Sequence, residues 1–501
     1  MEAIGEEAGG YVTELGYTHR YCPQIAPSRI ALACAAQGLQ CPGNPSPRYL
    51  ELAFGQGVSI NIHAAAAPGE YWGIDIIPSH VDNARQLAAA SGSGAHLSCE
   101  SFETFAARGD LPQFDVIAMH GAWSWISAEN RHLVVEIVRK CLAPEGVCLI
   151  SYNCLPGWAG ELPLRHLLVL HASLAPGSQP LASRIDASLE FACSLLGAGA
   201  KYFEAHRGLA AWLQKMHRQD RSYVAHEYFN RDWHPMPSSE VALALEGAGL
   251  RFGASAMLAG RDDESALGPK ARELLAGIEH PILRETTLDY LTDRRFRSDI
   301  FVKRGLRPDS QSLYERIGRV PFALLQHPDY VPSRFMLGGN EIELPAKVHR
   351  PFVAAMAASG YAPKALGDIS NEPECKGIPP EELAEAALAL TEAGYLHPAQ
   401  ARAAIDDAAA RCKALNAAIL GRVGSPGEIA ALASSVTGAG VFAARQEMLF
   451  LRARALGLSC GDEWARHAWD TAGQDNPASL RSDAAAFARI RLPVFEALGL
   501  A

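Results

Sequence analysis

The stretch RYLELAFGQG, residues 48–57, decides the fold of this chain. Residues 48–54 form a short apolar stretch that ends in a glycine turn, which is typical of a strand leading into a helix. Gly55 and Gly57 let the backbone approach a ligand and take positive φ, and a helix starting there offers free N–H groups. A dinucleotide-binding turn would carry a third glycine where this sequence has Ile60. No Gly-Lys-Ser/Thr follows the turn, so it is not a P-loop.

Strands and helices alternate after this turn. We expect further strands at 71–76, 95–99, 114–119 and 146–152, with helices at 61–67, 78–90 and 129–141 between them. Such alternation predicts parallel βαβ units, and right-handed crossovers build them into one doubly wound sheet. Ligands of these sheets bind at the carboxyl edge of the strands, so the loops that follow the strands hold the candidate site.

Two acidic residues mark the first two strands. Glu51 lies within the first strand, four residues before Gly55, and this pattern resembles the first motif of class I S-adenosylmethionine (SAM) methyltransferases. In that class the methionine part of SAM lies against the turn. Asp75 ends the second strand, where a carboxylate can accept both ribose hydroxyls of an adenosyl group. The alternatives are a solvated carboxylate for Glu51 and a helix cap for Asp75.

The next two loops extend the candidate cofactor site. Glu100, Ser101 and Phe102 follow the third strand, where adenine would lie, although Phe102 could equally be a core residue. His120 follows the fourth strand and would border the transferred methyl group, with a hydrogen-bonded loop histidine as the alternative.

Aromatic and polar residues after the fourth and fifth strands and near residue 226 are candidates for binding a methyl acceptor. They are Trp123, Trp125, Tyr152, Asn153, Trp158, His226 and Tyr228. His120, Tyr152 and Trp158 are the candidates for a direct catalytic role. Core packing is the alternative for Trp123 and Trp125, and a buried polar network is the alternative for the segment around His226.

The alternation of strands and helices stops after residue 155. Residues 156–234 have mainly helical patterns, whereas 238–248 predicts a capped helix and 250–258 and 295–302 predict two strands. The expected organisation is an N-terminal segment or lid at 1–47, a SAM-binding core at 48–155, a helical insertion at 156–234, completion of the sheet at 235–305, and a mostly helical domain at 306–501. A winged-helix-like arrangement is one option for the last part, in which 335–344 predicts a hairpin.

Composition narrows the class of partner. The net charge of −10 over 501 residues argues against broad nucleic-acid binding and permits a cationic acceptor such as a lysine side chain. Residues 1–20 lack the apolar run of a secretory signal, and no run of about 18 apolar residues predicts a membrane span. None of the 11 cysteines forms a C-x-x-C pair, so we expect no metal site and a reducing, cytoplasmic setting.

Three further stretches carry a more specific resemblance. ISYNCLPGW (150–158), YVAHEYFN (223–230) and DRRFRSDIFV (293–302) are similar to segments of bacterial class I methyltransferases that carry a methyltransferase regulatory domain. That group includes protein-lysine methyltransferases that modify outer-membrane proteins. The resemblance covers residues 10–305 well and 306–501 in outline. The chain departs from it at Phe54, where a small residue is usual before the first glycine.

The resemblance implies SAM as the cofactor, with Tyr17 or Tyr21 folding over it as a lid. The full set of expected cofactor-binding residues is Tyr17, Tyr21, Glu51, Ala53, Gly55, Gly57, Asp75, Glu100, Ser101, Phe102 and His120. The expected activity is protein-lysine N-methylation. The alternatives are a small-molecule O- or N-methyltransferase, an NAD-dependent reductase, which the missing third glycine disfavours, and a non-catalytic SAM-binding regulator. A homodimer is an option.

Overall fold

The computed structural model describes residues 18–39, 44–176, 178–258, 267–303, 311–337, 340–472 and 477–501. Tyr17, expected in a lid, lies outside the described residues.

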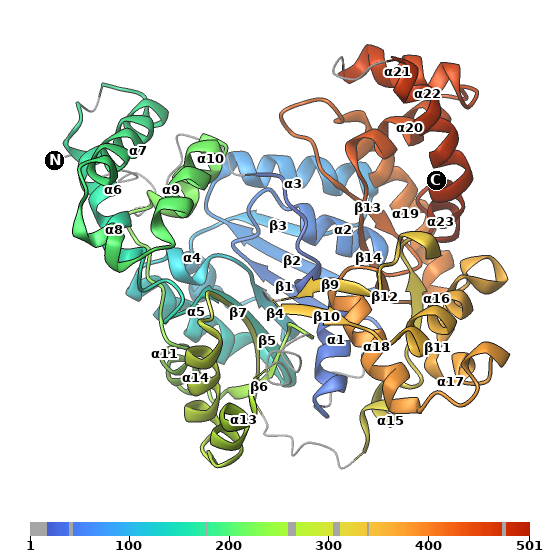
Figure 1. Cartoon of the computed structure of the whole chain (residues 1–501), viewed down its shortest axis with the longest axis horizontal. Coiled ribbons are helices and arrows are strands. Elements are labelled where there is room, and N and C mark those ends of the chain that lie inside the picture. The colour runs from blue at the N-terminus through green and yellow to red at the C-terminus, as the bar shows by residue number, and fades with distance from the viewer. Residues whose placement is uncertain are drawn as a thin grey trace.

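A seven-stranded sheet lies at the centre of the molecule, with the strand order β3-β2-β1-β4-β5-β7-β6 (Figure 1). The strands are β1 (Arg48–Leu52), β2 (Glu70–Asp75), β3 (His96–Cys99), β4 (Phe114–Met119), β5 (Leu142–Asn153), β6 (Arg251–Ser255) and β7 (Phe296–Val302). Pairing is parallel from β3 through β5 and antiparallel for β5 with β7 and for β7 with β6. The predicted Rossmann-like sheet with a final antiparallel strand pair is confirmed.

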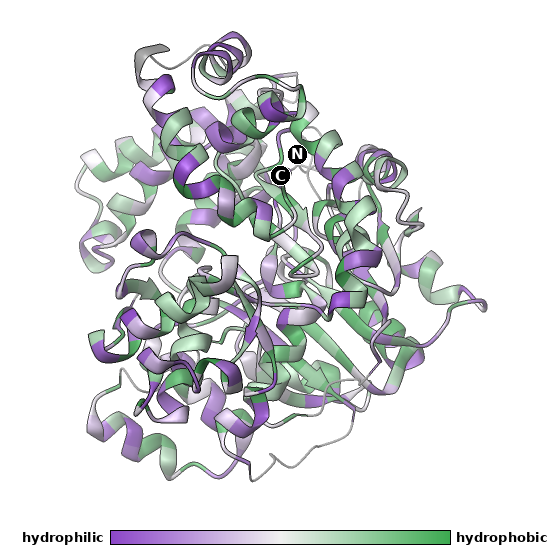
Figure 2. Cartoon of the chain, turned by 90° about the vertical axis from the view of Figure 1, so that its right-hand side faces the viewer, coloured by the Kyte–Doolittle hydropathy of each residue, from purple (hydrophilic) through white to green (hydrophobic). Residues whose placement is uncertain are grey.

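Helices cover both faces of this sheet. They are α1 (Pro27–Ala36), α2 (Val58–Ala66), α3 (Pro78–Ser91), α4 (Phe102–Ala107) and α5 (Ala128–Cys141), with the short turns η2 (Pro23–Ile25) and η3 (Trp123–Trp125). One face packs against α4 and α5, and the other packs against α1, α2 and α3. Apolar residues concentrate on the strands and on the inner sides of these helices (Figure 2).

The segment after β5 forms a helical lobe beside the sheet. Its helices are α6 (Leu162–Leu174), α7 (Leu181–Gly197), α8 (Lys201–Ala205), α9 (Leu209–Arg218) and α10 (Arg221–Tyr228). They bury a core of their own, which includes Leu168, Ile185 and Leu213. The chain then returns to the sheet through α11 (Ser238–Glu246), β6, α13 (Pro269–Ala276), α14 (Pro281–Thr292) and β7.

The C-terminal part is mostly helical. Its helices are α15 (Leu313–Ile317), α16 (Ala346–Tyr361), α17 (Leu366–Ile369), α18 (Pro380–Glu392), α19 (Arg402–Gly421), α20 (Arg445–Ala455), α21 (Asp462–Ala472), α22 (Pro477–Ala486) and α23 (Leu492–Ala497), with the short turns η4 (Pro328–Tyr330), η5 (Pro373–Cys375) and η6 (Phe487–Arg491). Strands β8 (Pro321–Leu324), β11 (Lys364–Ala365) and β12 (Leu396–Pro398) form a three-stranded sheet; β9 (Arg334–Leu337) pairs with β10 (Asn340–Glu343), and β13 (Ala431–Ser434) pairs with β14 (Ala439–Phe442).

Helix α2 lies between the sheet and the C-terminal part. All nine of its residues are buried, because α19 and the β13–β14 hairpin pack against the side of α2 that faces away from the sheet. The helix that follows the glycine turn is thus enclosed by two parts of the chain that lie more than 300 residues apart in sequence. Among the described residues, no helix has the length and apolar composition that crossing a membrane requires.

Candidate active site at the carboxyl edge of the sheet

The turn after β1 has an unusual backbone. Ala53, Gly55 and Gly57 all have positive φ, at 57°, 60° and 69°. A side chain at Gly57 would not fit, because its Cβ would lie 2.3 Å from the Cβ of Ala84 on α3. The turn therefore needs glycine at Gly57 both for its dihedral angle and for the close approach of α3.

Asp75 lies directly against this turn. Its Oδ2 accepts a hydrogen bond from the Gly55 N–H at 2.8 Å, and its Oδ1 accepts one from the Ile77 N–H at 2.9 Å. His80 Nδ1 lies 3.3 Å from the same Oδ1. The structure thus brings together the glycine turn and the carboxylate that sequence analysis assigned to the ribose.

The neighbouring Ile76 was missed by sequence analysis. Its side chain is 50% exposed at the end of β2, although large aliphatic side chains are usually buried. An exposed apolar side chain directly after Asp75 suits the face of a nucleobase. Its place in the run Ile74 to Ile77 resembled strand core, so the signal could be found only once its exposure was known.

Glu51 is a buried carboxylic acid. It is 4% exposed, and burial raises its pKa to about 8, with the nearby Cys22 thiol as a further cause. The Tyr49 hydroxyl donates to its Oε2 at 3.4 Å. An acid held protonated beside the glycine turn would ionise if a positively charged group bound next to it.

His120 directly follows β4, on the same edge of the sheet. Burial lowers the pKa of its imidazole to about 4, so the ring is neutral at ordinary pH. Its Nδ1 lies 3.0 Å from the Ser151 hydroxyl oxygen, which also accepts a hydrogen bond from the Gly121 N–H at 2.8 Å. Ser151 therefore fixes the orientation of the ring.

The side chains of the loop after β3 form contacts within the protein. Glu100 forms an ion pair with Arg108 at 3.1 Å, and the Ser101 hydroxyl caps α4 by accepting from the Thr104 N–H at 3.1 Å. Phe102 is partly buried against the apolar core. The Ser101 side chain thus caps a helix, which corrects its expected role at a nucleobase.

Tyr21 is not a lid. It is 5% exposed, and its hydroxyl accepts a hydrogen bond from the Gly440 N–H of β14 at 2.8 Å. Its ring fills the space in which a Cβ on Gly440 would stand. The lid was expected from the family resemblance, whereas in this structure the C-terminal hairpin holds the ring of Tyr21.

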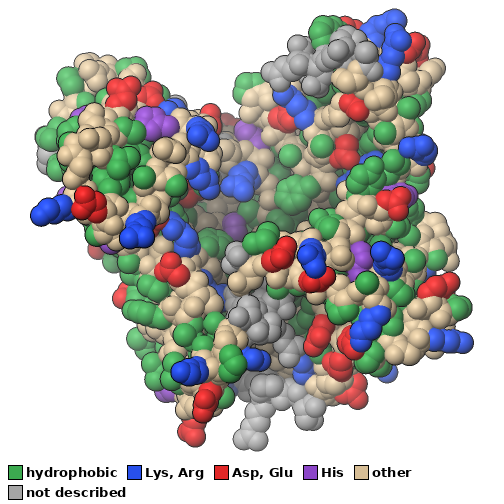
Figure 3. All heavy atoms as spheres, viewed as in Figure 1, with side chains coloured by type: hydrophobic (Ala, Val, Ile, Leu, Met, Phe, Trp, Pro, Cys, Tyr) green, Lys and Arg blue, Asp and Glu red, His purple; other side chains and the backbone are tan. Residues whose placement is uncertain are grey.

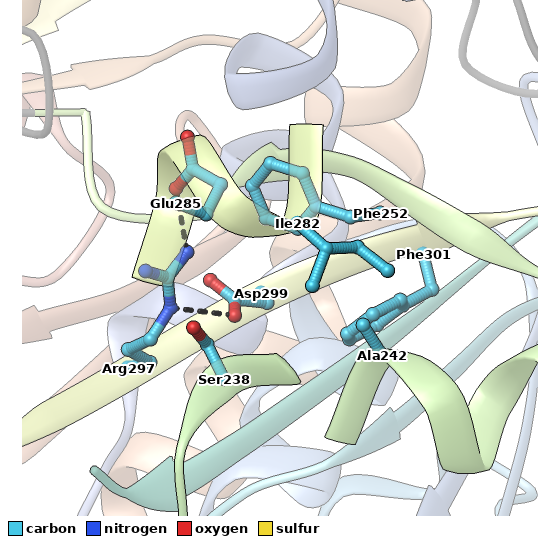
Figure 4. Close-up of a pocket in the computed structure, with 8 residues that line it drawn as sticks. All are labelled: Ser238, Ala242, Phe252, Ile282, Glu285, Arg297, Asp299 and Phe301. Atoms are coloured by element: carbon cyan, nitrogen blue, oxygen red, sulfur yellow. Dashed lines mark hydrogen bonds and ion pairs between the residues drawn. The ribbon is translucent and has the colours of Figure 1, made fainter. Parts of the chain in front are cut away.

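Tyr152 is not a catalytic residue at this edge. Strand alternation turns it away from Ser151, and its hydroxyl donates to Asp299 Oδ2 at 2.6 Å. Arg297 pairs with Asp299 at 2.7 Å, with Asp289 at 2.6 Å and with Glu285 at 2.8 Å. Figure 4 shows the ion pairs of Arg297 with Asp299 and Glu285, beside a cavity of about 10 Å³.

Three other acceptor candidates also have internal partners. Trp123 is fully buried, and its Nε1 lies 3.3 Å from the Met236 sulfur, so it is a core residue. Asn153 is buried, and its backbone N–H donates to the Ser124 hydroxyl at 2.9 Å, whereas its side-chain Nδ2 has no hydrogen-bond partner among the described residues. Trp125 packs under the insertion and donates to the Glu227 carbonyl at 3.4 Å.

Trp158 belongs to an aromatic cluster of the insertion. Its ring lies 5.3 Å from Trp233 and 6.1 Å from Tyr228, and the Arg295 guanidinium stands 4.1 Å above it. An internal cation therefore already occupies one face of a ring that was a candidate for binding the methyl acceptor. His226 and Tyr228 are 2% and 8% exposed, so both side chains are largely enclosed.

Two charged residues missed by sequence analysis act on the His120 ring. After burial, its pKa responds to Glu51, which raises it, to Arg20, which lowers it, and to Glu227, which raises it. Glu227 lies four residues after Tyr223 on α10, so the two side chains share a helix face. The same two charges act on the Tyr223 hydroxyl, whose pKa Glu227 raises and Arg20 lowers. The four-residue spacing from Tyr223 is the sequence signal that could have singled out Glu227 among the residues of this helix.

The molecular surface is hollowed between the helical insertion and the C-terminal helices, with Lys and Arg side chains gathered along the insertion side (Figure 3). The described residues contain no group of three or more His, Cys, Asp or Glu side chains arranged to hold a metal ion.

Family models match two parts of the chain. A methyltransferase domain matches residues 50–148, and a predicted methyltransferase regulatory domain matches residues 220–303. The chain is 35% identical over 448 residues to sll1526, an uncharacterised protein of Synechocystis sp., covering 89% of this chain and 87% of that protein. It is 24% identical over 291 residues to the uncharacterised protein RP789 of Rickettsia prowazekii, covering 56% of this chain and 50% of that protein.

A solved structure shares nearly the whole architecture. PKMT2 from Rickettsia typhi, in complex with AdoHcy, superposes with a TM-score of 0.72 at 17% identity, covering 97% of this chain and 99% of that chain. The fold and the two family models define a class I SAM-dependent methyltransferase with a regulatory domain. Within that class, the chain belongs to the family of sll1526.

Proposed function

We propose that this methyltransferase transfers a methyl group from SAM to a lysine side chain of a protein. The observation that carries the acceptor class is the carboxylate of Glu227 on α10 of the insertion, which lies near enough to His120 for its charge to raise the pKa of that imidazole. An anionic group at this place would attract a cationic side chain. The fold that the chain shares along nearly its full length with PKMT2 of Rickettsia typhi, which was solved in complex with AdoHcy, supports the methyl-transfer part of this proposal.

The residues at the glycine turn suit SAM. Gly55 and Gly57 allow close approach of the methionine part, Asp75 lies where the ribose hydroxyls would be, and the buried acid of Glu51 suits a positively charged amino group. SAM, when bound there, supplies a methyl group on a positively charged sulfur. We assign no direct contact to Ser101, because its hydroxyl is already used as a helix cap.

In the methyl transfer, the main task of the protein is to align the acceptor nitrogen, the methyl carbon and the sulfur. A lysine amine attacks the methyl carbon, the new N–C bond forms as the C–S bond breaks, and the electron pair stays on sulfur. The lysine ammonium must first lose a proton, which passes to solvent water before the amine enters the site. A site with few water molecules favours the neutral amine. Burial keeps the His120 ring neutral, and Ser151 holds its orientation beside the acceptor.

The hollow between the insertion and the C-terminal helices is where we place the acceptor protein (Figure 3). It opens between two lobes, so an exposed segment of another protein could reach the site. The described cysteines are free thiols, which fits the proposal that the enzyme works in the reducing cytoplasm.

Incubating the purified enzyme and a cell extract with methyl-labelled SAM tests this function. We expect the label in protein bands, with acid hydrolysis releasing methylated lysine and alkali leaving the label in place. Asp75→Ala serves as the inactive control. Label in the small-molecule fraction, or label that alkali removes from protein, would overturn the lysine assignment.

A further inference from the structure

The C-terminal part of the chain reaches the glycine turn through two side chains. Arg422 Nη1 donates a hydrogen bond to Asn83 Oδ1 at 2.7 Å, and Asn83 Nδ2 donates to the carbonyl oxygen of Gln56 at 2.7 Å. Gln56 lies between the two glycines of the turn. We refer to these contacts as the Arg422–Asn83 bridge.

The polarity of this bridge is determined by its ends. An arginine only donates and a backbone carbonyl only accepts, so the Asn83 amide has a single orientation that satisfies both. A second amide holds the next carbonyl, since Asn61 Nδ2 donates to Gly57 O at 2.8 Å and to Ala84 O at 3.0 Å. The turn is therefore held through its carbonyl groups, which leaves the Gly55 N–H for Asp75.

The bridge connects parts that are distant in sequence. Arg422 caps the C-terminal end of α19, a helix that packs on both α2 and α3, and Asn83 lies on α3. Among the described residues, the Arg422 side chain makes one hydrogen bond, to Asn83, and no acidic side chain lies within ion-pair distance of it. Holding the asparagine is thus the contact that the structure shows for this cation.

We propose that Arg422 is a positioning residue for the cofactor: through Asn83 it holds the glycine turn in the shape that receives SAM. This inference rests on the proposed placement of SAM against the turn. It gives the C-terminal part a role in cofactor binding that is separate from any contact with the acceptor. Without the bridge the turn can relax, and SAM must restore its shape on binding.

The test measures binding of S-adenosylhomocysteine, the demethylated product, to the full-length protein by calorimetry. Arg422→Met keeps the length of the side chain and removes its donors, and we expect roughly tenfold weaker binding. Arg422→Lys, which can still donate to Asn83, should recover most of the affinity. In turnover assays the KM for SAM should rise with little change in kcat, because no group that contacts the acceptor is altered.

A double-mutant cycle separates the bridge from general packing. Asn83→Ala should weaken binding on its own, and adding Arg422→Met to it should cause no further loss. Arg411→Met is the matched control, because Arg411 lies on the same helix and bonds the Ala65 carbonyl at the far end of α2 at 3.3 Å. It should leave the affinity unchanged.

Normal affinity in Arg422→Met, or an equal loss in Arg411→Met, would overturn the inference. If Arg422→Met fails to fold, Asn83→Ala breaks the same bridge from the other side, and normal affinity in that variant would also overturn the inference.

Asp75→Ala separates a failure of the bridge from a failure of the proposed SAM site. If it binds normally, the placement of SAM itself is wrong, whereas loss in Asp75→Ala with normal binding in both bridge variants rejects the bridge alone.

Discussion

Two residues at the candidate site, one acid and one base, are buried in their neutral forms, and their pKa values shift in opposite directions. Burial raises the pKa of the Glu51 acid to about 8 and lowers the pKa of the His120 base to about 4. Both shifts follow from the cost of placing a charge in a poorly solvated place. Because SAM carries positive charge, the free site is poised to change its protonation when SAM binds.

Binding should therefore release a proton from Glu51. At pH 7 this acid is mostly protonated in the free protein, and a cationic ligand beside it favours the carboxylate. Calorimetry of S-adenosylhomocysteine, which keeps the amino group, should give an enthalpy that depends on the ionisation enthalpy of the buffer. Glu51→Gln should remove this dependence. The idea fails if the wild-type enthalpy is the same in phosphate and in Tris.

Glu227 carries the second prediction at this scale. Replacing it with glutamine removes the negative charge near His120 while keeping the size of the side chain. We expect the KM for the protein acceptor to rise by roughly tenfold, equivalent to about 1.4 kcal/mol, with unchanged affinity for S-adenosylhomocysteine. Glu204→Gln, on the exposed side of the insertion, is the control. Equal effects of the two substitutions would argue against a role in acceptor binding.

At the scale of elements, the contact between the glycine turn and α3 is the tightest feature of the site. Gly57 and Gly92 both have positive φ, at 69° and 65°, but only Gly57 has a neighbour within reach of an added Cβ. The two positions therefore separate the cost of backbone strain from the cost of overlap.

Gly92→Ala should cost about 1–2 kcal/mol, the usual penalty for a left-handed residue with a Cβ. Gly57→Ala should cost about 1–3 kcal/mol more, because its methyl group overlaps Ala84. Denaturant unfolding measures both values, and S-adenosylhomocysteine affinity should fall in Gly57→Ala alone. Equal stability of the two variants would show that α3 moves away freely.

The position of a residue within its strand also explains where sequence reasoning succeeded and failed within the site. The glycine turn and Asp75 lie at the carboxyl ends of neighbouring parallel strands, and these ends meet at one edge of the sheet whatever the length of the connections between them. Tyr152 was misassigned because the partners of its side chain, Asp299 and Arg297, come from the antiparallel strand β7. That pairing joins residues about 150 positions apart, which local sequence patterns do not determine.

At the scale of the whole molecule, buried histidines link the catalytic sheet to the C-terminal part. His63 of α2 lies 3.4 Å from the Tyr21 hydroxyl, and burial lowers its pKa to about 3. His397 of β12 is also buried, with its pKa lowered to about 4. Neither ring can take up a proton near neutral pH while this interface is intact.

Acid should therefore destabilise the fold. Unfolded histidines bind protons below pH 6.5, whereas the folded rings stay neutral to about pH 4, so stability is full above pH 6.5 and falls as the pH drops. Each histidine contributes about 1.4 kcal/mol per pH unit over that range. Thermal unfolding between pH 7.5 and 5 measures the slope. His63→Gln should make it shallower, and an unchanged slope would contradict this role.

The sequence alone determined the Rossmann-like sheet, the glycine turn with Glu51 and Asp75, and the class of the protein, because these features arise from local periodicity and from residues at strand ends. The tertiary structure alone decided the enclosure of α2, the anchoring of Tyr21 on β14 and the Arg422–Asn83 bridge. The strands β13 and β14 are short and rich in small residues, so no pattern predicted them. Contacts between segments hundreds of residues apart depend on how whole surfaces fit, which local patterns do not encode.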